Sequence, residues 1–175
     1  MSKTIFETER LIFKDFDLKN FDDFCKVNMD KEIMKYFEGH EKSYRECLEK
    51  YSEMTNSNEK YHITYWAVYT KENEHFIGQC GFLHNYDMTI NLCYAYLKKE
   101  WGKGYGTEAG TGAIKYLFDN FPNVNEITAM AQNENKKSIH LLTKLGFTFT
   151  YESTGTQNKI FHYKLDRNEY TTRSK

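Results

Sequence analysis

The chain has 175 residues, and its 24 lysines and arginines against 25 acidic residues give a net charge of −1. This length favours a single domain over residues 1–175, with a core that its 17% aromatic residues would fill. The balanced charge lacks the basic excess of a nucleic-acid-binding domain, so we expect no nucleic acid partner. No apolar run reaches the length of a membrane span, and the first residues lack a signal-peptide core. We therefore expect a cytoplasmic protein without membrane contact.

The four cysteines argue for reduced structural thiols rather than a metal site. They are Cys25, Cys47, Cys80 and Cys93, with long and irregular separations. A zinc site in a protein needs closely spaced cysteine or histidine ligands, and the chain has no C-x-x-C pair. We expect no metal.

The first sixty residues predict one strand followed by two helices. The strand covers residues 8–14. Asp17 then caps a helix whose apolar residues recur at helical spacing. Ser43 opens the second helix, with Glu46 three residues on to complete a capping box. The turn-rich residues 55–58 are expected to end it.

The middle of the chain predicts three strands and a helix. Residues 64–69 and 76–83 are separated by a short polar run, which is typical of a hairpin. Residues 89–97 alternate in polarity and lead directly into a glycine-rich loop. The following helix covers 107–121, and Pro122 ends it.

The last fifty residues predict strand, helix and two strands. The helix starts at Asn135 and is closed by Gly146 as a C-cap, and the final strands cover 147–151 and 160–165. With a strand over 126–131, the element order indicates an α/β domain of the α+β type. Its sheet would be mixed and mostly antiparallel, with helices on both faces.

The stretch from Trp101 to Ala109 reads Trp-Gly-Lys-Gly-Tyr-Gly-Thr-Glu-Ala. Its three glycines stand at alternate positions between a predicted strand and a predicted helix. Glycine lets a loop turn tightly and bring its backbone close to a ligand. The helix that follows offers N–H groups without helical partners and the positive end of its dipole. The loop therefore predicts a site for a phosphate or pyrophosphate.

Together with two further motifs, this loop resembles the GNAT superfamily of acyl-CoA-dependent N-acyltransferases. The family writes the loop Q/R-x-x-G-x-G/A. The run Asn135–Ser138, followed by Lys144–Phe147, resembles the family's N-x-x-S and K-L-G-F. Residues 76–82 contain Phe-Ile-Gly and Gly-Phe in the strand before the cofactor strand. The branch most similar is that of the ribosomal-protein alanine N-acetyltransferases, and the resemblance covers nearly the whole chain.

The resemblance implies acetyl-CoA as the acyl donor, an amine as the acceptor, and a defined set of donor-binding residues. Backbone amides of the loop would hold the pyrophosphate, the strand edge before it would pair with the pantetheine arm, and the start of the later helix would bind near the thiol. The implied residues are Tyr96, Leu97, Trp101, Gly102, Lys103, Gly104, Tyr105, Gly106, Thr107, Asn135 and Ser138. Asn135 is alternatively a plain helix N-cap, Ser138 a plain first-turn residue, and Trp101 an anchor for the loop.

Two positions depart from the family pattern. Many relatives carry a tyrosine seven residues after the asparagine, as the acid that protonates the thiolate, whereas this chain has Leu142. The role would pass to Ser138 or water. The cofactor strand often begins with glutamate in this branch, and here the residue is Asn91. Without that carboxylate an α-amino group is the easier acceptor, because its pKa near 8 leaves much more of it neutral than the pKa near 10.4 of an alkyl amine.

The acceptor side is less defined than the donor side. The candidate bases are Glu9, His84, Asp87 and Glu100, of which His84 has the most suitable ordinary pKa. We take Ser138, Tyr96 and His84 as the candidate catalytic set, with a backbone N–H near Tyr96 meeting the oxyanion. The residues expected to line the acceptor pocket are Met34, Tyr36, Phe37 and the turn Glu38-Gly39-His40. Asp30, Glu38 and Glu41 would attract a cationic acceptor.

Two other functions fit parts of the sequence. Gly104–Ala109 satisfies the dinucleotide fingerprint G-x-G-x-x-A, with Glu126 about 20 residues on, but the fingerprint belongs after the first strand of a parallel unit. A second alternative is a module that binds acyl-CoA without turnover, which Asn91 and Leu142 motivate. The acceptor's identity, and the choice between monomer and homodimer, stay open.

Overall fold

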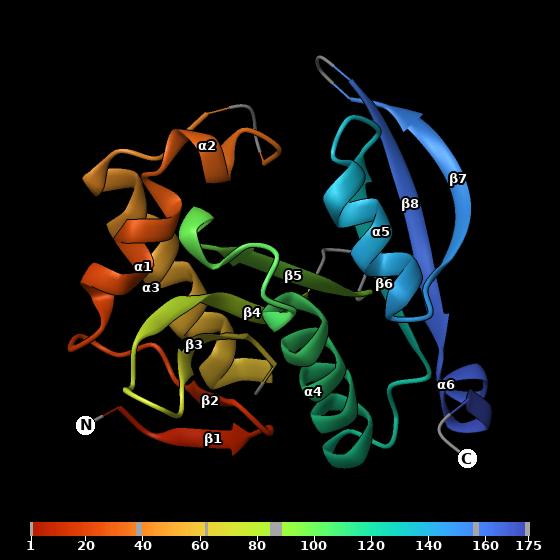
Figure 1. Ribbon diagram of the computed structural model, residues 1–175, viewed down its shortest axis with the longest axis horizontal. Helices are drawn as coiled ribbons and strands as arrows, with labels where there is room; N and C mark the ends of the chain where they lie inside the picture. Colours follow the sequence, from red (N-terminus) through yellow and green to blue (C-terminus); the bar gives the residue numbers. More distant parts are fainter. Residues whose placement is uncertain (1, 38–39, 62, 85–88, 156–157, 174–175) are drawn as a thin grey trace.

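The computed structural model describes residues 2–37, 40–61, 63–84, 89–155 and 158–173, and it is built on one eight-stranded sheet (Figure 1). The strands are β1 (Thr4–Glu7), β2 (Leu11–Lys14), β3 (Tyr65–Thr70), β4 (Phe76–His84), β5 (Ile90–Tyr96), β6 (Glu126–Gln132), β7 (Thr148–Thr154) and β8 (Lys159–Asp166). The helices are α1 (Phe21–Asn28), α2 (Lys31–Met34), α3 (Tyr44–Tyr61), α4 (Tyr105–Asn120), α5 (Lys136–Lys144) and α6 (Arg167–Arg173), with a 3₁₀ turn at Lys98–Glu100.

The order of the strands in the sheet is β1-β2-β3-β4-β5-β6-β8-β7, and every neighbouring pair is antiparallel except β5 and β6. The parallel pair is joined at one register position, Asn91 opposite Thr128. Beyond that position the two strands separate (Figure 1). This divergence opens the sheet in its middle and positions the site described below.

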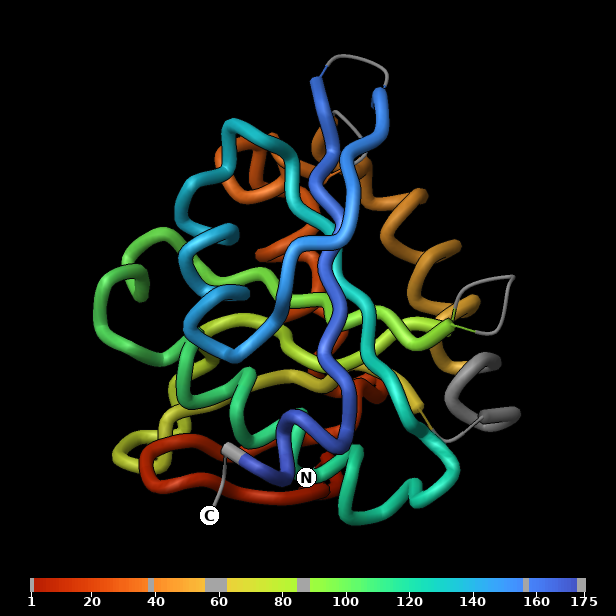
Figure 2. Tube along the Cα trace, turned by 90° about the vertical axis from the view of Figure 1, so that its right-hand side faces the viewer, coloured from red at the N-terminus to blue at the C-terminus, as the bar shows by residue number. Residues whose placement is uncertain are grey.

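Helices cover both faces of the sheet, as the sequence predicted. The burial of β3 shows this coverage. A strand turns alternate side chains to opposite faces of a sheet, and all six residues of β3 are buried. Trp66 and Val68 join the larger core cluster with α4, whereas Tyr65 and Ala67 join a second cluster with α1 and α3. Figure 2, turned by 90°, shows α3 and α5 on opposite sides of the sheet. The predicted fold class is confirmed.

Several boundaries differ from the predictions. The expected strand over 8–14 is the second of two, since β1 precedes it across a turn at residues 8–10. Asn20, not Asp17, is the N-cap position of α1, and Asp17 instead accepts the backbone N–H of Lys19 (2.8 Å) in the preceding turn. The short helices α2 and α6 were not predicted, because each is below the length at which periodicity is readable.

The capping box that opens α3 is confirmed. The Ser43 backbone N–H donates to Glu46 Oε2 (2.7 Å), and the Glu46 N–H donates to Ser43 Oγ (3.3 Å). The helix continues to Tyr61 instead of ending at residues 55–58. Thr55 shows how a turn-favouring residue is tolerated there, because its hydroxyl donates to the helix carbonyls of Tyr51 and Ser52.

Candidate active site

A cleft of about 680 Å³ lies where β5 and β6 separate. Four segments line it: the α2 region, the end of β5, the glycine loop with the start of α4, and the start of α5. The lining residues are Glu32, Ile33, Tyr36 and Phe37; Tyr94, Ala95 and Tyr96; Glu100, Trp101, Gly102, Gly104, Tyr105 and Gly106; and Glu134, Asn135, Lys136, Lys137, Ser138, His140 and Leu141. The sequence motifs that stand some thirty residues apart therefore meet in one cavity.

The edge of β5 turns main-chain groups into this cleft. The Leu97 N–H donates to the Ile77 carbonyl (2.9 Å), and the antiparallel register with β4 is unbroken along the whole of β5. Hydrogen-bonding direction alternates along such a strand, so the N–H groups of Tyr94 and Tyr96 point away from β4. The strand on that side, β6, has already diverged. An extended ligand can therefore pair with β5 as an added strand.

The alternation corrects one predicted binding residue. Leu97 was expected to pair with a ligand, but its N–H is bonded to Ile77 on β4 and its carbonyl accepts the N–H of Glu100 (2.9 Å). Tyr96 is differently placed, because its carbonyl accepts the indole N–H of Trp101 (2.8 Å) on the cleft side. Leu97, Lys103 and Thr107 are the predicted donor-binding residues that do not line the cleft.

The glycine loop has the backbone that an anion site needs. Gly102 and Gly104 adopt φ angles of 80° and 81°, in the left-handed region that favours glycine. The N–H groups of the first turn of a helix have no intrahelical acceptor, and Gly104, at the N-cap position of α4, provides no side-chain cap for them. A Cβ on Gly106 would lie 3.2 Å from Leu141 Cδ2, and α4 thus begins close against α5. These features fit a pyrophosphate.

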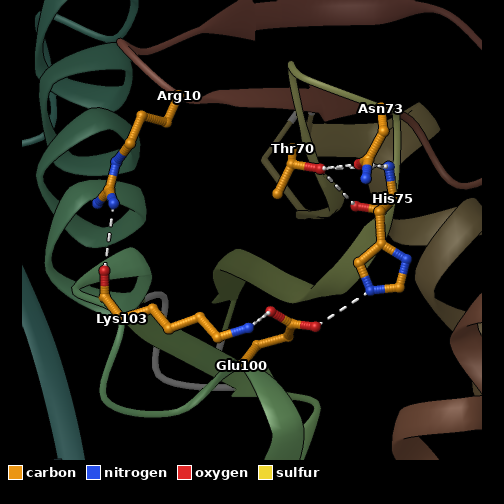
Figure 3. Close-up of polar contacts among 6 residues, drawn as sticks. All are labelled: Arg10, Thr70, Asn73, His75, Glu100 and Lys103. Carbon is orange, nitrogen blue, oxygen red and sulfur yellow. Dashed lines mark hydrogen bonds and ion pairs between the residues drawn. The ribbon is translucent and has the colours of Figure 1, made fainter.

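The buried carboxylate of Glu100 binds Lys103 of the glycine loop and His75 (Figure 3). Glu100 Oε2 accepts from Lys103 Nζ (2.9 Å), and Glu100 Oε1 lies 3.1 Å from His75 Nε2. Burial acts to raise the pKa of the Glu100 carboxyl, but the hydrogen bonds and charges of Lys103 and His75 outweigh it and hold the pKa below its usual value. Glu100 was a candidate base. Its hydrogen bonds to Lys103 and His75 and its lowered pKa make it a poor proton acceptor and a structural support.

The turn between β3 and β4 fixes His75 in this network. Thr70 Oγ1 donates to Asn73 Oδ1 (2.7 Å), and the His75 N–H donates to the same oxygen (3.2 Å). Figure 3 shows these bonds holding the main chain from which the imidazole reaches Glu100. The loop is thus tied to the β3–β4 hairpin, about 30 residues earlier in the chain.

At the start of α5, the Asn135 and Ser138 side chains of the N-x-x-S motif make different hydrogen bonds. Asn135 Oδ1 accepts the Ser138 backbone N–H (3.1 Å), which is an N-cap bond. The Ser138 hydroxyl lies 2.7 Å from the Tyr94 hydroxyl of β5. Both residues of the motif also line the cleft, so the N-cap alternative and a ligand-facing position coexist at Asn135.

Trp101 and Lys137 meet across the cleft. The ammonium of Lys137 lies 4.3 Å from the centre of the Trp101 ring, a cation–π contact between α5 and the loop. Together with the indole N–H bond to Tyr96, this contact holds the ring at the cleft wall.

The two departures from the family pattern have structural explanations. Leu142 is fully buried in the larger core cluster. Asn91 is also buried, and its Oδ1 accepts from Thr128 Oγ1 (3.3 Å) while its Nδ2 donates to Cys93 Sγ (3.5 Å). Asn91 therefore fastens β5 to β6 at the one position where they pair.

The structure does not bring His84 together with Ser138 and Tyr96. His84 is opposite Ile90 at one end of the β4–β5 hairpin, whereas Tyr96 is at the other end opposite Gly78. Ile90 and Tyr96 are six residue steps apart along the strand, which corresponds to about 20 Å. The prediction of His84 as the base rested on residue type, and its place in the register speaks against it.

Several other acceptor-side predictions have different outcomes. Glu9 is exposed in the β1–β2 turn, and Met34 is buried in the second core cluster. Tyr36 and Phe37 line the cleft as predicted. Asp87, Glu38 and Gly39 lie outside the described residues.

Sequence reasoning gave Tyr94 no role and did not include Ile33. The alternation of Tyr94 with Tyr96 was a usable signal, because both side chains must point to the same face. Ile33 carried no such signal, since α2 was not predicted. Among the described residues, no three His, Cys, Asp or Glu side chains are grouped to hold a metal ion, and no helix is long and apolar enough to cross a membrane.

The chain is similar in sequence to known acetyltransferases. The sequence model of the acetyltransferase (GNAT) domain family matches residues 10–148. The chain is 28% identical over 146 residues to the uncharacterized N-acetyltransferase p20 of Bacillus licheniformis, covering 80% of each protein.

Two solved structures with different acceptors in their names share the fold about equally. The spermidine N-acetyltransferase of Vibrio cholerae, in complex with CoA and spermine, has a TM-score of 0.76 at 19% identity, over 92% of this chain and 98% of that one. The ribosomal-protein-S5-alanine acetyltransferase of Vibrio fischeri has a TM-score of 0.75 at 17% identity, over 94% and 97%. The fold therefore does not single out the ribosomal-protein alanine branch that the sequence motifs suggested.

Proposed function

Because the chain belongs to the GNAT acetyltransferase family, we propose that it transfers an acetyl group from acetyl-CoA to the primary amine of a protein N-terminus or a small molecule. The amine would attack the thioester directly while both substrates are bound. The observation that carries the proposal is the cleft between β5 and β6. One of its walls is a strand edge that ends at a glycine-lined helix N-terminus.

The donor fits the cleft from its phosphates inward. The amides of Gly102 to Gly106 and the start of α4 suit the pyrophosphate, because N–H groups and the helix dipole converge there. The edge at Tyr96 and Tyr94 suits the pantetheine arm, whose amides can pair with a strand. Ser138 and Asn135 face the same space from α5. The CoA named in the Vibrio cholerae structure supports this choice of donor.

The acceptor that we favour is an α-amino group. An amine must be neutral to attack a thioester, and at pH 7 an alkyl amine with a pKa near 10.4 pays about 4–5 kcal/mol for that state. An α-amino group with a pKa near 8 pays about 1–2 kcal/mol. Asn91 stands where a carboxylate base is common, and its amide is committed to Thr128 and Cys93. A weak base or a water chain suffices for an α-amino group.

Titration calorimetry with acetyl-CoA, CoA and NAD is the first test. We expect saturable micromolar binding of acetyl-CoA and CoA and none of NAD. Failure of acetyl-CoA to bind would overturn the proposal, and tight binding of NAD would favour a dinucleotide enzyme instead.

Gly104→Asp and Gly104→Asn form a matched pair of variants that tests the anion site, because both side chains tolerate the left-handed φ and only the first adds a negative charge. Asp should weaken acetyl-CoA binding much more than Asn.

Thiol release then identifies the acceptor. Wild-type protein with acetyl-CoA is given an alanine-initiated peptide, a free amino acid, spermine and an aminoglycoside in parallel. We expect the highest kcat/KM with an α-amino acceptor. Preference for spermine would contradict the α-amino assignment, and binding of acetyl-CoA without turnover of any amine would contradict catalysis.

A further inference from the structure

A side-chain hydrogen bond joins β5 and α5, two of the segments that line the cleft. The Tyr94 hydroxyl of β5 lies 2.7 Å from Ser138 Oγ and 3.4 Å from the Ser138 carbonyl oxygen of α5. A carbonyl oxygen only accepts, so Tyr94 is the donor in the longer contact, whereas either hydroxyl can be the donor in the shorter one. Burial raises the pKa of Tyr94 above its usual value, so the phenol keeps this hydrogen. When the phenol donates to Ser138 Oγ, the hydrogen of Ser138 is left for another acceptor.

The pair lies at the inner end of the cleft. Along β5, the path from the glycine loop passes Tyr96 first and Tyr94 next, toward the junction of Asn91 with Thr128. A ligand held by its phosphates at the loop and extended along β5 therefore brings its far end to Tyr94 and Ser138. In an acyl-CoA that far end is the thioester.

We propose that Tyr94 is a positioning residue whose phenol donates to Ser138 Oγ and so directs the Ser138 hydroxyl hydrogen at the departing sulfur. This inference rests on the proposed function. In the transfer, the amine nitrogen bonds to the thioester carbon and the C–S bond breaks with its electron pair going to sulfur. Ser138 donates a hydrogen bond to that charge. The sulfur takes the proton that the amine nitrogen loses, carried by water, while Tyr94 and Ser138 keep their own.

This arrangement compensates for Leu142. A hydroxyl at that position would come from the second turn of α5, but Leu142 is part of the core. Tyr94 supplies a phenol from the neighbouring strand instead. Hydrogen bonds in a chain polarise one another, so Ser138 becomes a stronger donor when it accepts from Tyr94. Serine alone lacks that assistance.

The kinetic test uses four variants on the amine that the wild-type protein turns over best. Tyr94→Phe should lower kcat about tenfold and keep the Kd for acetyl-CoA within about twofold of wild type, and Ser138→Ala should lower kcat about 100-fold. In the Ser138→Ala background, Tyr94→Phe should change kcat less than about twofold. Tyr116→Phe, which deletes a phenol oxygen of α4 on the side that packs against Phe6 and Trp66, is the control and should retain wild-type kcat. An unchanged kcat in Tyr94→Phe, or an equal loss in both backgrounds, would overturn the proposal.

A second measurement needs no amine. The thiol of bound CoA is titrated by the ultraviolet absorbance of its thiolate. A hydrogen bond from Ser138 to the thiolate lowers the thiol pKa, and Tyr94 strengthens that bond. Tyr94→Phe should therefore raise the pKa of the thiol of bound CoA by about half a unit to one unit. Tyr116→Phe should leave that pKa unchanged. If wild type binds CoA but turns over no amine, the proposed function fails and this shift still decides the role of Tyr94. Absence of the shift overturns that role.

Discussion

Glu108 in α4 and Arg10 in the β1–β2 turn, 98 residues apart in sequence, form an ion pair with 2.6 Å between Glu108 Oε2 and Arg10 Nε. The other carboxylate oxygen accepts from the Arg10 backbone N–H (2.7 Å) and the Thr8 hydroxyl (2.6 Å). The guanidinium in turn donates to the Lys103 carbonyl and lies over the Tyr105 ring. The β1–β2 turn thus contacts the glycine loop and the start of α4 through Arg10 and Thr8.

Glu108→Gln should loosen that loop. An amide in place of the carboxylate turns an N–H₂ group toward a guanidinium donor and removes the charge favoured at a helix N-terminus. We expect the Kd for acetyl-CoA to rise about fivefold and the free energy of unfolding to fall by about 1–2 kcal/mol, with kcat unchanged. Calorimetry and urea unfolding measure the two effects. Asp119→Asn, on an exposed pair with Lys115 of the same helix, is the matched control and should change neither.

The local signals of this site were readable from the sequence. The capping box at Ser43 and the N-cap at Asn135 each depend on residues within one turn. The glycine loop depends on one strand–helix junction, and all three stand where the sequence predicted. The errors at Leu97 and His84 have a different origin. Each depends on the register of β5 against β4, which sets which amides face the cleft and how far a residue lies from it.

The Tyr94–Ser138 bond was unreadable for a related reason. It connects residues 44 apart, and it exists only because β5 and β6 diverge after one pairing position. Neither the divergence nor the position of α5 above it leaves a periodic pattern in the sequence. Residue types predicted the chemistry of the donor side, and tertiary contacts decide which groups perform it.

Glu100→Gln should alter the pH dependence of stability. The folded pKa of Glu100 lies below its ordinary value, so its stabilising contribution is complete above about pH 5 and is lost as pH falls through the folded pKa. The variant should lose about 2 kcal/mol of unfolding free energy at pH 7, because a buried carboxylate bonded to the Lys103 ammonium and to His75 is replaced. The difference from wild type should shrink toward pH 3. Urea unfolding at several pH values measures it, and a difference independent of pH would contradict the role of the carboxylate.

The four cysteines should differ in reactivity. Cys25, Cys47 and Cys80 are buried, whereas Cys93 is half-buried. Burial raises the pKa of Cys25 and Cys80 to about 12 and that of Cys93 to about 11. The thiolate is the reactive form, so at pH 8 a disulfide reagent should modify Cys93 first and slowly, and the other three only on unfolding.

Two additions sharpen the thiol measurement. Cys93→Ser should remove the first phase and leave the others unchanged. Acetyl-CoA at 100 times its Kd should slow the unfolding-dependent phases about 100-fold, because it binds the folded state alone. Rapid reaction of all four thiols in the native protein would contradict the packing of α1 against α3.

Gly112 in α4 should resist a substitution that helix propensity favours. Alanine is better than glycine in a helix interior by about 1 kcal/mol, yet a Cβ at Gly112 would lie 2.5 Å from Thr8 Cγ2 and 3.3 Å from Phe6 Cε2. Threonine is stiff at χ1, and its hydroxyl is held by Glu108, so Thr8 cannot turn away without losing that bond. Gly112→Ala should therefore lower the unfolding free energy by about 1–3 kcal/mol.

Gly110 and Thr8 provide the controls for that prediction. A Cβ at Gly110 would approach Leu145 Cδ1 to 2.6 Å, but that atom is the end of a side chain that can change rotamer. Gly110→Ala should thus cost less than Gly112→Ala. Thr8→Ser removes the obstructing methyl group and keeps the hydroxyl for Glu108, so it should restore most of the stability lost in Gly112→Ala. Urea unfolding of the three single variants, and of the double variant that combines Thr8→Ser with Gly112→Ala, measures these differences. If Thr8→Ser gives no recovery, the loss at Gly112 arises elsewhere than in the packing of α4 on the β1–β2 turn.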